Sequence, residues 1–354
     1  MSSGFWDQKK VLVTGHTGFK GAWLCLCLLE RGASVLGYSL EPPTDPNLYE
    51  FLRLDGELES VHGDVLDLNR ILDCFRRFKP DIAIHLAAQS LVGESYLRPV
   101  DTYAVNVLGT VHFLECLRDS SSVRAGIVVT SDKCYKDPGS GVPHREDDPL
   151  GGRDPYSSSK GGAELAVAAY RESFPAADGS PRCAIASVRA GNVIGGGDWA
   201  KDRLIPDMVR AFHRKEPVVL RNPNAVRPWQ HVLEPVSGYV VLAERLWDGG
   251  LDYAEAWNFG PLTAEEMSVS HVASRFAVHW GNGAKWIASD QAAFPETGAL
   301  RLDSTKALRR LGWKPKLDLE TSIDWTARWY KGYERGEDLR QICEQQAKEY
   351  RDRP

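Results

Sequence analysis

The feature that most constrains this chain is a glycine-rich loop between a strand and a helix near its N-terminus. Lys9–Thr14 (KKVLVT) has the pattern of a buried strand. Gly15-His-Thr-Gly18-Phe-Lys-Gly21 follows it and opens a helix expected over Gly21–Arg31. Glycine lets backbone N–H groups approach a phosphate, and the helix N-terminus adds the positive end of its dipole. The loop therefore predicts a site for a dinucleotide pyrophosphate, with an ordinary tight turn as the alternative.

The first half of the chain continues to alternate apolar runs with helical patterns. Such alternation predicts a parallel sheet with helices on both faces, and right-handed crossovers then make it a doubly wound, Rossmann-type α/β fold. Further strands are expected over Ser34–Leu40, Asp81–Ala87, Gly126–Thr130 and Arg182–Arg189, and further helices over Asp67–Phe78, Tyr103–Leu117 and Asp154–Phe174.

The pattern loosens after Gly191, where loops rich in Gly, Asn and Pro separate shorter elements. We therefore expect a dinucleotide-binding domain over residues 1–190, with a segment near 226–260 returning to it. A smaller α/β substrate domain would comprise residues 191–225 and 261–354. The last two dozen residues are strongly charged with sparse apolar positions, which predicts a solvated terminal helix.

Composition narrows the classes of partner. The net charge of −5 and the pI of about 6.0 exclude the basic footprint of a nucleic-acid-binding protein. The longest apolar run, Ala22–Leu29, is too short to span a membrane, and Met1–Lys10 lacks the apolar region of a secretory signal. Seven cysteines without a CxxC pair, and histidines without ligand spacing, predict neither a disulfide framework nor a metal site. These features favour a reducing cytoplasm.

A second pattern, Tyr156-Ser-Ser-Ser-Lys160, follows Asp154, a good N-cap residue, so both side chains share one helix face. A lysine ammonium stabilises a nearby phenolate, so the pKa of Tyr156 is expected to fall from about 10 toward neutrality, as a general base requires. Alone, the pattern could be an exposed helix pair. A strand that ends at Ser131 lies between it and the glycine loop, which favours a catalytic site.

The GxxGxxG spacing, together with Ser131, Tyr156 and Lys160, resembles the extended branch of the short-chain dehydrogenase/reductase superfamily, which acts on nucleotide sugars. The resemblance implies that Tyr156 removes a hydroxyl proton while a hydride passes to nicotinamide, and that Ser131 hydrogen-bonds the substrate hydroxyl. It also implies that Tyr156 and Lys160 contact the cofactor, together with Gly15, Thr17, Gly18, Phe19, Lys20, Gly21, Ser39, Asp64, Val65, Leu86, Ala87, Ala88 and Gln89.

The end of the second expected strand departs from the usual pattern. An acidic residue is expected there to hold the adenosine ribose, but Ser39 occupies the position and Glu41 lies a little beyond. No arginine stands at the strand end to meet a 2′-phosphate, so we favour NAD over NADP. Asp64 would contact adenine, with a simple turn residue as the alternative.

The residues after Ser131 resemble a narrower group within this superfamily. Nucleotide-sugar 4,6-dehydratases follow it with an acid and a base, typically Asp-Glu, and this chain has Asp132-Lys133. The segments HTGFKG, LAAQ, YKD and RPWQHV carry the same resemblance, which runs from Val11 to about Trp313. It implies a lyase that oxidises the sugar at C4, removes the C5 proton and the C6 hydroxyl as water, and returns the hydride to C6, as in deoxy-sugar and lipopolysaccharide biosynthesis. Asp132 would be the general acid and Lys133 the C5 base; alternatively Tyr135 is the base, or Lys133 only balances Asp132.

Several polar residues on other loops are candidates for binding a nucleotide-diphosphate sugar. The family contacts the diphosphate through an Asn at the position of Asn192, which could instead simply form a turn. Arginines suit this role because a planar guanidinium pairs with phosphate oxygens, although each could equally form a surface ion pair. Trp199 could stack on the base or belong to the core. The predicted substrate contacts are Ser90, Asn192, Arg203, Arg227 and Arg301.

Members of this superfamily commonly dimerise through a four-helix bundle, which implies a homodimer here. The expected interface helices carry an apolar stripe, Val107, Val111, Leu114 and Leu117, which could also be core, and small residues after Tyr156. Two rival functions are a dehydratase or epimerase for another nucleotide sugar, and a non-catalytic NAD-sensing regulator. The pair Asp132-Lys133 argues against an epimerase, and the retained Ser131, Tyr156 and Lys160 argue against a regulator.

Overall fold

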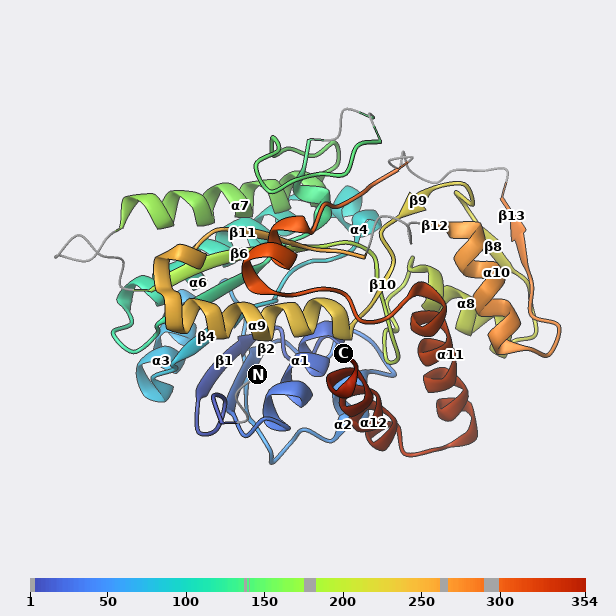
Figure 1. Cartoon of the computed structure of the whole chain (residues 1–354), viewed down its shortest axis with the longest axis horizontal. Coiled ribbons are helices and arrows are strands. Elements are labelled where there is room, and N and C mark those ends of the chain that lie inside the picture. The colour runs from blue at the N-terminus through green and yellow to red at the C-terminus, as the bar shows by residue number, and fades with distance from the viewer. Residues whose placement is uncertain (1–3, 137–138, 140, 175–182, 262–266, 290–298) are drawn as a thin grey trace.

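The computed structural model describes residues 4–136, 139, 141–174, 183–261, 267–289 and 299–354. At its centre lies a parallel sheet with the strand order β11-β6-β5-β4-β1-β2-β3 (Figure 1). The predicted doubly wound α/β fold is confirmed. The strand order reverses between β1 and β4, where such sheets bind ligands. The strands are β1 (Lys10–Thr14), β2 (Ser34–Ser39), β3 (Glu59–His62), β4 (Ile82–His85), β5 (Ala125–Val129), β6 (Ala184–Ala190) and β11 (Ala256–Phe259).

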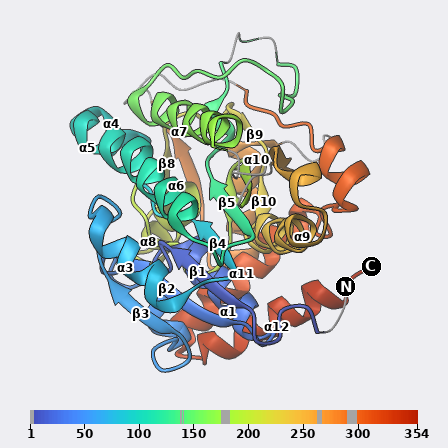
Figure 2. The same cartoon turned by 90° about the vertical axis from the view of Figure 1, so that its left-hand side faces the viewer.

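Helices cover both faces of this sheet (Figure 2). One face packs on α3 (Leu68–Phe78), α6 (Gly109–Asp119) and α7 (Pro155–Ser173), and the other on α1 (Phe19–Leu29) and α9 (Leu233–Gly249). Successive strand residues alternate between the two layers: Leu12 packs with the first group, and Val11 and Val13 with the second. The central strands β4, β5 and β6 are buried along their whole length and are mostly apolar, whereas the edge strand β3 is largely exposed.

Half of the apolar stripe considered for an interface belongs to the core, which is the alternative that the sequence left open. Leu114 and Leu117 on α6 are fully buried against the sheet because this face of the helix covers the core. The helix continues from α4 (Val92–Leu97) and α5 (Pro99–Tyr103) through a π-helical turn, η1 (Ala104–Leu108). The exposed large apolar side chains of this stretch are Tyr96, Leu97, Val100, Tyr103 and Leu108.

The second lobe is built from short elements beside the C-terminal ends of the strands (Figure 1). It contains α8 (Leu204–His213), β8 (Val218–Leu220), α10 (Val269–Trp280), β13 (Trp286–Ala288) and α11 (Leu319–Arg335). Two short ladders join it to the rest, β7 (Val193–Ile194) with β10 (Gln230–His231) and β9 (Val226–Arg227) with β12 (Met267–Ser268). The chain then returns through α9 to β11 at the edge of the main sheet. The remaining short elements are α2 (Leu48–Leu52), η2 (Asp132–Cys134), η3 (Gly250–Tyr253) and η5 (Ala307–Leu311).

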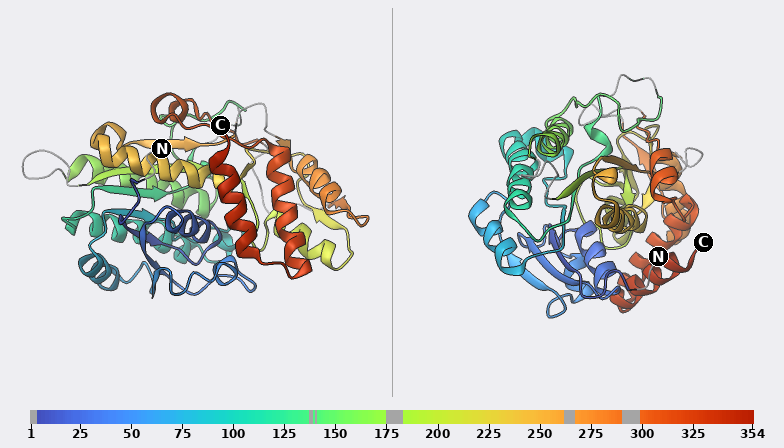
Figure 3. Two further views of the ribbon diagram at one scale, coloured as in Figure 1. Left: turned by 60° about the horizontal axis from the view of Figure 1, so that its bottom comes forward. Right: turned by 60° about the vertical axis from the view of Figure 1, so that its left-hand side comes forward.

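The terminal helix α12 (Leu339–Asp352) lies beside α11 and packs against α1 and α2 (Figure 3). The prediction of a solvated helix is wrong for one face, where Leu339, Cys343, Ala347 and Tyr350 are buried. Their spacing of four, four and three residues makes a narrow stripe, which the surrounding charges obscure in the sequence. Arg340 and Arg351 on this helix pair with Glu57 and Glu30.

Among the described residues, no helix combines the length and apolarity needed to cross a bilayer. Nowhere among them do three or more His, Cys, Asp or Glu side chains gather as metal ligands. All seven cysteines are buried and free.

Candidate active site

A cavity of about 1830 Å³ lies between the C-terminal ends of the strands and the second lobe. Single small-molecule sites measure roughly 300–1,000 Å³, so this cavity has room for two large ligands side by side. Most of the predicted site residues line it: Gly15, Thr17, Gly18, Phe19, Lys20, Gly21, Ser39, Asp64, Val65, Leu86, Ala87, Ala88, Ser90, Ser131, Asp132, Lys133, Tyr156, Lys160, Asn192, Arg203 and Arg227.

The glycine loop forms a cradle that side chains would fill. Gly15 has a φ of +76°, and a Cβ there would lie 2.7 Å from the Ala87 nitrogen. A Cβ on Gly21 would collide with the Gly15 carbonyl oxygen. Helix α1 begins at Phe19, two residues earlier than expected, and its N-cap Gly18 supplies no side-chain cap. The first-turn N–H groups therefore lack a side-chain acceptor, and the cradle fits a pyrophosphate.

The end of β2 presents hydroxyl groups and carboxylates. The Ser39 and Thr17 hydroxyl groups are 2.8 Å apart. The ionisable lining residues in the loops after β2 and β3, all of which are described, are Glu41, Asp45 and Asp64. Asp64 also accepts a hydrogen bond from the Leu66 amide at 2.9 Å, so it shapes the turn as well as lining the cavity.

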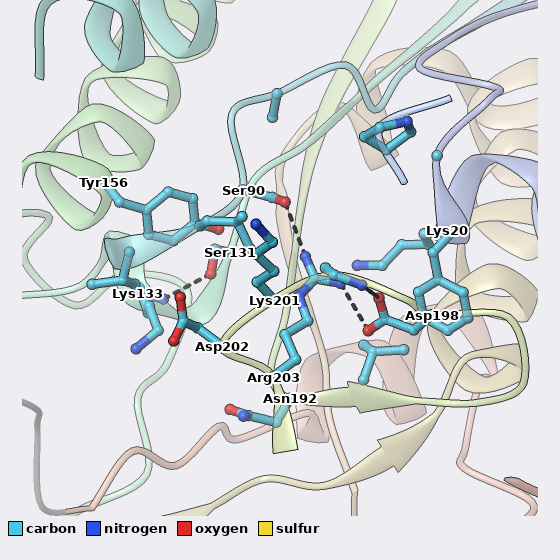
Figure 4. Close-up of a pocket in the computed structure, with 18 of the residues that line it drawn as sticks. Lys20, Ser90, Ser131, Lys133, Tyr156, Asn192, Asp198, Lys201, Asp202 and Arg203 are labelled. Atoms are coloured by element: carbon cyan, nitrogen blue, oxygen red, sulfur yellow. Dashed lines mark hydrogen bonds and ion pairs between the residues drawn. The ribbon is translucent and has the colours of Figure 1, made fainter. Parts of the chain in front are cut away.

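Ser131 and Asp132 follow β5 after Thr130, and both line the cavity with Tyr156. Figure 4 shows Ser131 beside Tyr156. The Ser131 hydroxyl donates to Asp132 Oδ1 at 3.0 Å and accepts from the Lys133 amide at 3.2 Å, which fixes the turn η2. On the neighbouring helix, Asp154 caps α7 by accepting from the Ser157 amide at 2.9 Å. This cap fixes the start of the helix that carries Tyr156.

Asp132 is buried, and desolvation raises the pKa of its carboxyl group, against the attraction of Lys133. Its Oδ2 atom has no hydrogen-bond partner among the described residues. A buried carboxyl oxygen without a partner is far less costly as the protonated acid than as an anion. The geometry therefore favours an Asp132 that carries a proton into the cavity.

The expectation of a lowered pKa for Tyr156 is wrong in this structure. Burial raises the pKa of the phenol to about 12, although a hydrogen bond with Ser131 opposes the shift. Lys160 is also desolvated, which lowers its pKa to about 8, and its ammonium points toward the Val129 carbonyl oxygen at 3.5 Å. Burial penalises both the phenolate and the ammonium. The effect of desolvation on the pKa of Tyr156 therefore outweighs that of Lys160.

A buried carboxylate that the sequence patterns did not single out ties this site to the sheet. Glu164 on α7 accepts hydrogen bonds from Thr130 at 2.5 Å and Ser187 at 2.7 Å, and pairs with Arg189 at 2.8 Å. Thr130 directly precedes Ser131, so Glu164 links the Tyr156 helix to the loop that carries the predicted acid. Its spacing after Lys160 on one helix face was the available signal.

Tyr135, the alternative base, has its hydroxyl group in the same buried network. It accepts from Arg189 at 2.7 Å and donates to Asn258 at 2.7 Å. Burial raises the pKa of the phenol. The hydroxyl is therefore engaged away from the reacting groups, and this arrangement disfavours Tyr135 as a base.

Two predicted residues lie outside the cavity lining. The Gln89 side chain donates to Thr102 at 2.9 Å, and its amide donates to Asn106 at 2.9 Å, so it braces the loop after β4 instead of facing the cofactor site. Arg301 is absent from the lining residues, and its carbonyl accepts from the His144 amide at 2.9 Å. Its role as a substrate contact stays a prediction.

The substrate side of the cavity centres on Arg203. Its guanidinium donates to Asp198 Oδ2 at 3.0 Å and to the Ser90 hydroxyl at 2.9 Å (Figure 4). Trp199 lines the cavity but packs its ring against Tyr330 and Tyr333, with ring centres 5.2 and 4.9 Å apart. Asp198 was not among the predicted site residues.

A doubly wound sheet with a glycine cradle, and a Ser131-Tyr156-Lys160 set at its carboxyl edge, define an extended short-chain dehydrogenase/reductase. The chain belongs to the GDP-mannose 4,6 dehydratase family, whose sequence model matches residues 12–326.

Individual relatives agree with this assignment. The chain is 47% identical over 341 residues to a CDP-glucose 4,6-dehydratase of Salmonella typhimurium, covering 96% of this chain and 95% of the relative. It is 25% identical to the human dTDP-D-glucose 4,6-dehydratase, covering 94% and 95% of the two chains. A dTDP-glucose 4,6-dehydratase of Streptomyces venezuelae, solved with NAD bound, superposes with a TM-score of 0.77 at 23% identity, covering 93% of this chain and 99% of that one. A UDP-glucose 4-epimerase of Thermotoga maritima superposes with a TM-score of 0.79 at 21% identity, covering 92% and 99%. The last two likenesses show the fold alone, since dehydratases and epimerases share it.

Proposed function

We propose that the chain is a lyase that uses bound NAD to convert CDP-D-glucose into CDP-4-dehydro-6-deoxy-D-glucose and water. The observation that carries this proposal is Asp132, a buried carboxyl group with an unpartnered oxygen beside Ser131 and Tyr156. A dehydratase needs an acid for the departing C6 hydroxyl, whereas a 4-epimerase does not. The 47% identical relative, a CDP-glucose 4,6-dehydratase, supports CDP as the nucleotide.

The residues of this chain divide the proton transfers among them. Tyr156, hydrogen-bonded by Ser131, removes the proton of the C4 hydroxyl, and Lys160 contributes positive charge nearby. Lys133 removes the C5 proton once the C4 ketone has acidified it, and Asp132 protonates the leaving C6 hydroxyl so that it departs as water. The glycine cradle would hold NAD, which would supply the hydride acceptor for C4 and the hydride donor for C6, while protonated Lys133 returns a proton to C5.

The cradle of Gly15 and Gly21 would hold the NAD pyrophosphate, and Ser39 with Thr17 would face the adenosine ribose. The carboxylates of Glu41, Asp45 and Asp64 line this end of the cavity. A 2′-phosphate would meet these negative charges without a guanidinium or ammonium from the same loops. This electrostatic pattern supports NAD in preference to NADP.

The test is incubation with CDP-, dTDP-, GDP- and UDP-sugars, following the alkaline absorbance of 4-keto-6-deoxy sugars. We expect a signal with CDP-glucose. Its absence there, with a signal for another nucleotide, would move the proposal to a dehydratase for that sugar. No signal with any of them, together with NAD binding, would favour the regulator.

We also propose a homodimer that pairs the α4–α6 stretch and α7 of two copies. Val100 and Leu165 expose large apolar side chains on adjacent helices, at 79% and 61% of their accessible area. Such a patch is typical of an interface. Leu165→Arg should convert the dimer to a monomer in light scattering, with Leu308→Arg, another exposed leucine, as the control. A wild-type monomer would exclude the dimer.

Two features support further proposals of location and pathway. Seven free, buried cysteines suit a reducing cytoplasm. A 4-keto-6-deoxy product suits a place upstream of enzymes that reduce or aminate ketones in deoxy-sugar biosynthesis.

A further inference from the structure

We propose that Asp198 is a positioning residue that orients Arg203 to bind the substrate diphosphate, an inference that rests on the nucleotide-sugar function proposed above. Asp198 lies on the loop between β7 and α8 and lines the cavity, and its side chain is only 5% exposed. Arg203 ends the same loop as the N-cap of α8.

The contacts of Arg203 fix its guanidinium across the cavity. Nη1 donates to Asp198 Oδ2 at 3.0 Å in the second lobe, and Nη2 donates to the Ser90 hydroxyl at 2.9 Å on the loop after β4. Figure 4 shows the two bonds leaving opposite sides of the group. A guanidinium held at both terminal nitrogens cannot rotate, so it binds a diphosphate with less loss of conformational freedom.

Asp198 itself is held from two directions. Its Oδ1 accepts from the Ala200 amide at 3.2 Å, and its carbonyl oxygen accepts from the Tyr330 hydroxyl on α11. Tyr330 also packs edge-on against Trp199, the next residue of the loop. The carboxylate is therefore part of a built support and is not a free surface charge.

The negative charge of Asp198 lets an experiment distinguish two roles: orienting Arg203, or merely lying near the substrate diphosphate. A carboxylate near a diphosphate repels it, so neutralising a bystander should tighten substrate binding. Neutralising a positioning carboxylate should weaken binding, because Arg203 loses the partner that orients it. The two roles therefore predict opposite changes in KM.

The experiment compares wild type with Asp198→Asn, which keeps an acceptor for the Ala200 amide. We expect the KM for CDP-glucose, and the calorimetric Kd for CDP alone, to rise about tenfold. The kcat should change less than KM, because the groups that transfer protons in this scheme stay in place, and the Kd for NAD should be unchanged, because the glycine cradle holds NAD in this scheme. Arg203→Lys, which keeps the charge but lacks the fork, should raise KM similarly, and the double variant should be no worse than either single one.

The matched control is Asp202→Asn, which removes the same charge from the same loop but from a residue paired with Arg221 at 3.0 Å. Its KM should not rise. Should Asp198→Asn fail to fold, Ser90→Ala removes the other anchor from an exposed position and should raise KM and the CDP Kd in the same way. Unchanged or lower KM and CDP Kd in a folded Asp198→Asn or in Ser90→Ala would overturn the inference. A wild type without turnover of any nucleotide sugar would overturn the proposed function, while CDP binding would still test the positioning.

Discussion

Burial shifts the ionisable side chains around the reaction centre toward their neutral forms. It raises the pKa values of Asp132 and Tyr156 and lowers those of Lys160 and Lys20 to about 8. A protonated Asp132 is the form that a general acid needs. Tyr156 must instead lose its proton to act as a base. It therefore depends on positive charge close to the phenolate during the reaction.

Asp132→Asn should separate the chemical steps. Without the acid, loss of the C6 hydroxyl should slow by about 10²–10⁴-fold, while oxidation at C4 continues. Because the raised pKa belongs to a group that must be protonated, wild-type activity should fall as pH rises through it, and the variant should lack that decline. Stopped-flow absorbance of reduced nicotinamide, which should accumulate in the variant, measures the effect. Normal turnover in Asp132→Asn would exclude this carboxyl group as the acid.

Lys133→Met tests the proposed base. The variant should oxidise the sugar but lose exchange of the C5 proton with solvent, because no amine remains to remove it. Mass spectrometry in deuterated water measures this exchange. Exchange at the wild-type rate in the variant would mean that Lys133 only balances the charge of Asp132.

The sequence predicted the residues of the site better than their surroundings. Ser131, Tyr156, Lys160 and the glycines belong to short patterns with local spacing, and all of them line the cavity. The backbone of Asp198 is held by Tyr330, 132 residues away, and no local pattern contains that information. The pKa of Tyr156 was mispredicted because the spacing to Lys160 says nothing about how deeply both groups are buried.

At the scale of the elements, the glycine loop has little room for added side-chain atoms. A methyl group on Gly21 would strike the Gly15 carbonyl oxygen, which is backbone and cannot yield without moving the loop. Gly21→Ala should therefore weaken NADH binding by at least about tenfold, measured by fluorescence titration. Gly4→Ala, whose methyl group meets nothing within 4 Å, is the control. Equal affinities in both variants would show that the loop does not contact the cofactor.

The elements also show where the hydrophobic pattern of the sequence predicts the structure and where it does not. Fully buried strands such as β5 are short apolar runs in the sequence, and their ends were predicted within about two residues. Helix α12 was predicted as solvated, since its buried stripe is only one residue wide and lies among Arg and Glu. Its burial depends on the surface of α1 and α2, which no pattern within α12 describes.

At the scale of the whole molecule, Glu234 joins the C-terminal region to the sheet. On α9 it accepts from the Lys316 and Leu317 amides at 2.9 and 2.7 Å, and from the Tyr350 hydroxyl of α12 at 2.7 Å. Burial raises its pKa to about 7 from an unfolded value of 4.5. The stability it contributes is complete below the unfolded pKa and is lost as pH rises through the folded pKa.

Glu234→Gln should remove this dependence, because an amide offers the same acceptor to the two backbone N–H groups without titrating. The Tm of the wild type should fall by several degrees more than that of the variant between pH 4.5 and 8, since each pKa unit corresponds to about 1.4 kcal/mol. Calorimetry at several pH values measures it. Parallel Tm profiles would mean that another group carries the pH dependence.

Strand β11, the seventh strand of the main sheet, means that the cofactor-binding region cannot be cut from the rest of the chain at residue 190. Strand β11 comes from residues 256–259, beyond α8 and β8, yet it pairs with β6 along the edge of the main sheet. A fragment that stops at residue 190 would leave β6, buried along its whole length, as a bare edge with open N–H and C=O groups. Flat apolar edges recruit strands from other chains, so such a fragment should aggregate instead of yielding a minimal cofactor-binding module. Exchanging substrate lobes between relatives would therefore require grafting a segment into the middle of the chain and keeping α9 and β11 with the host.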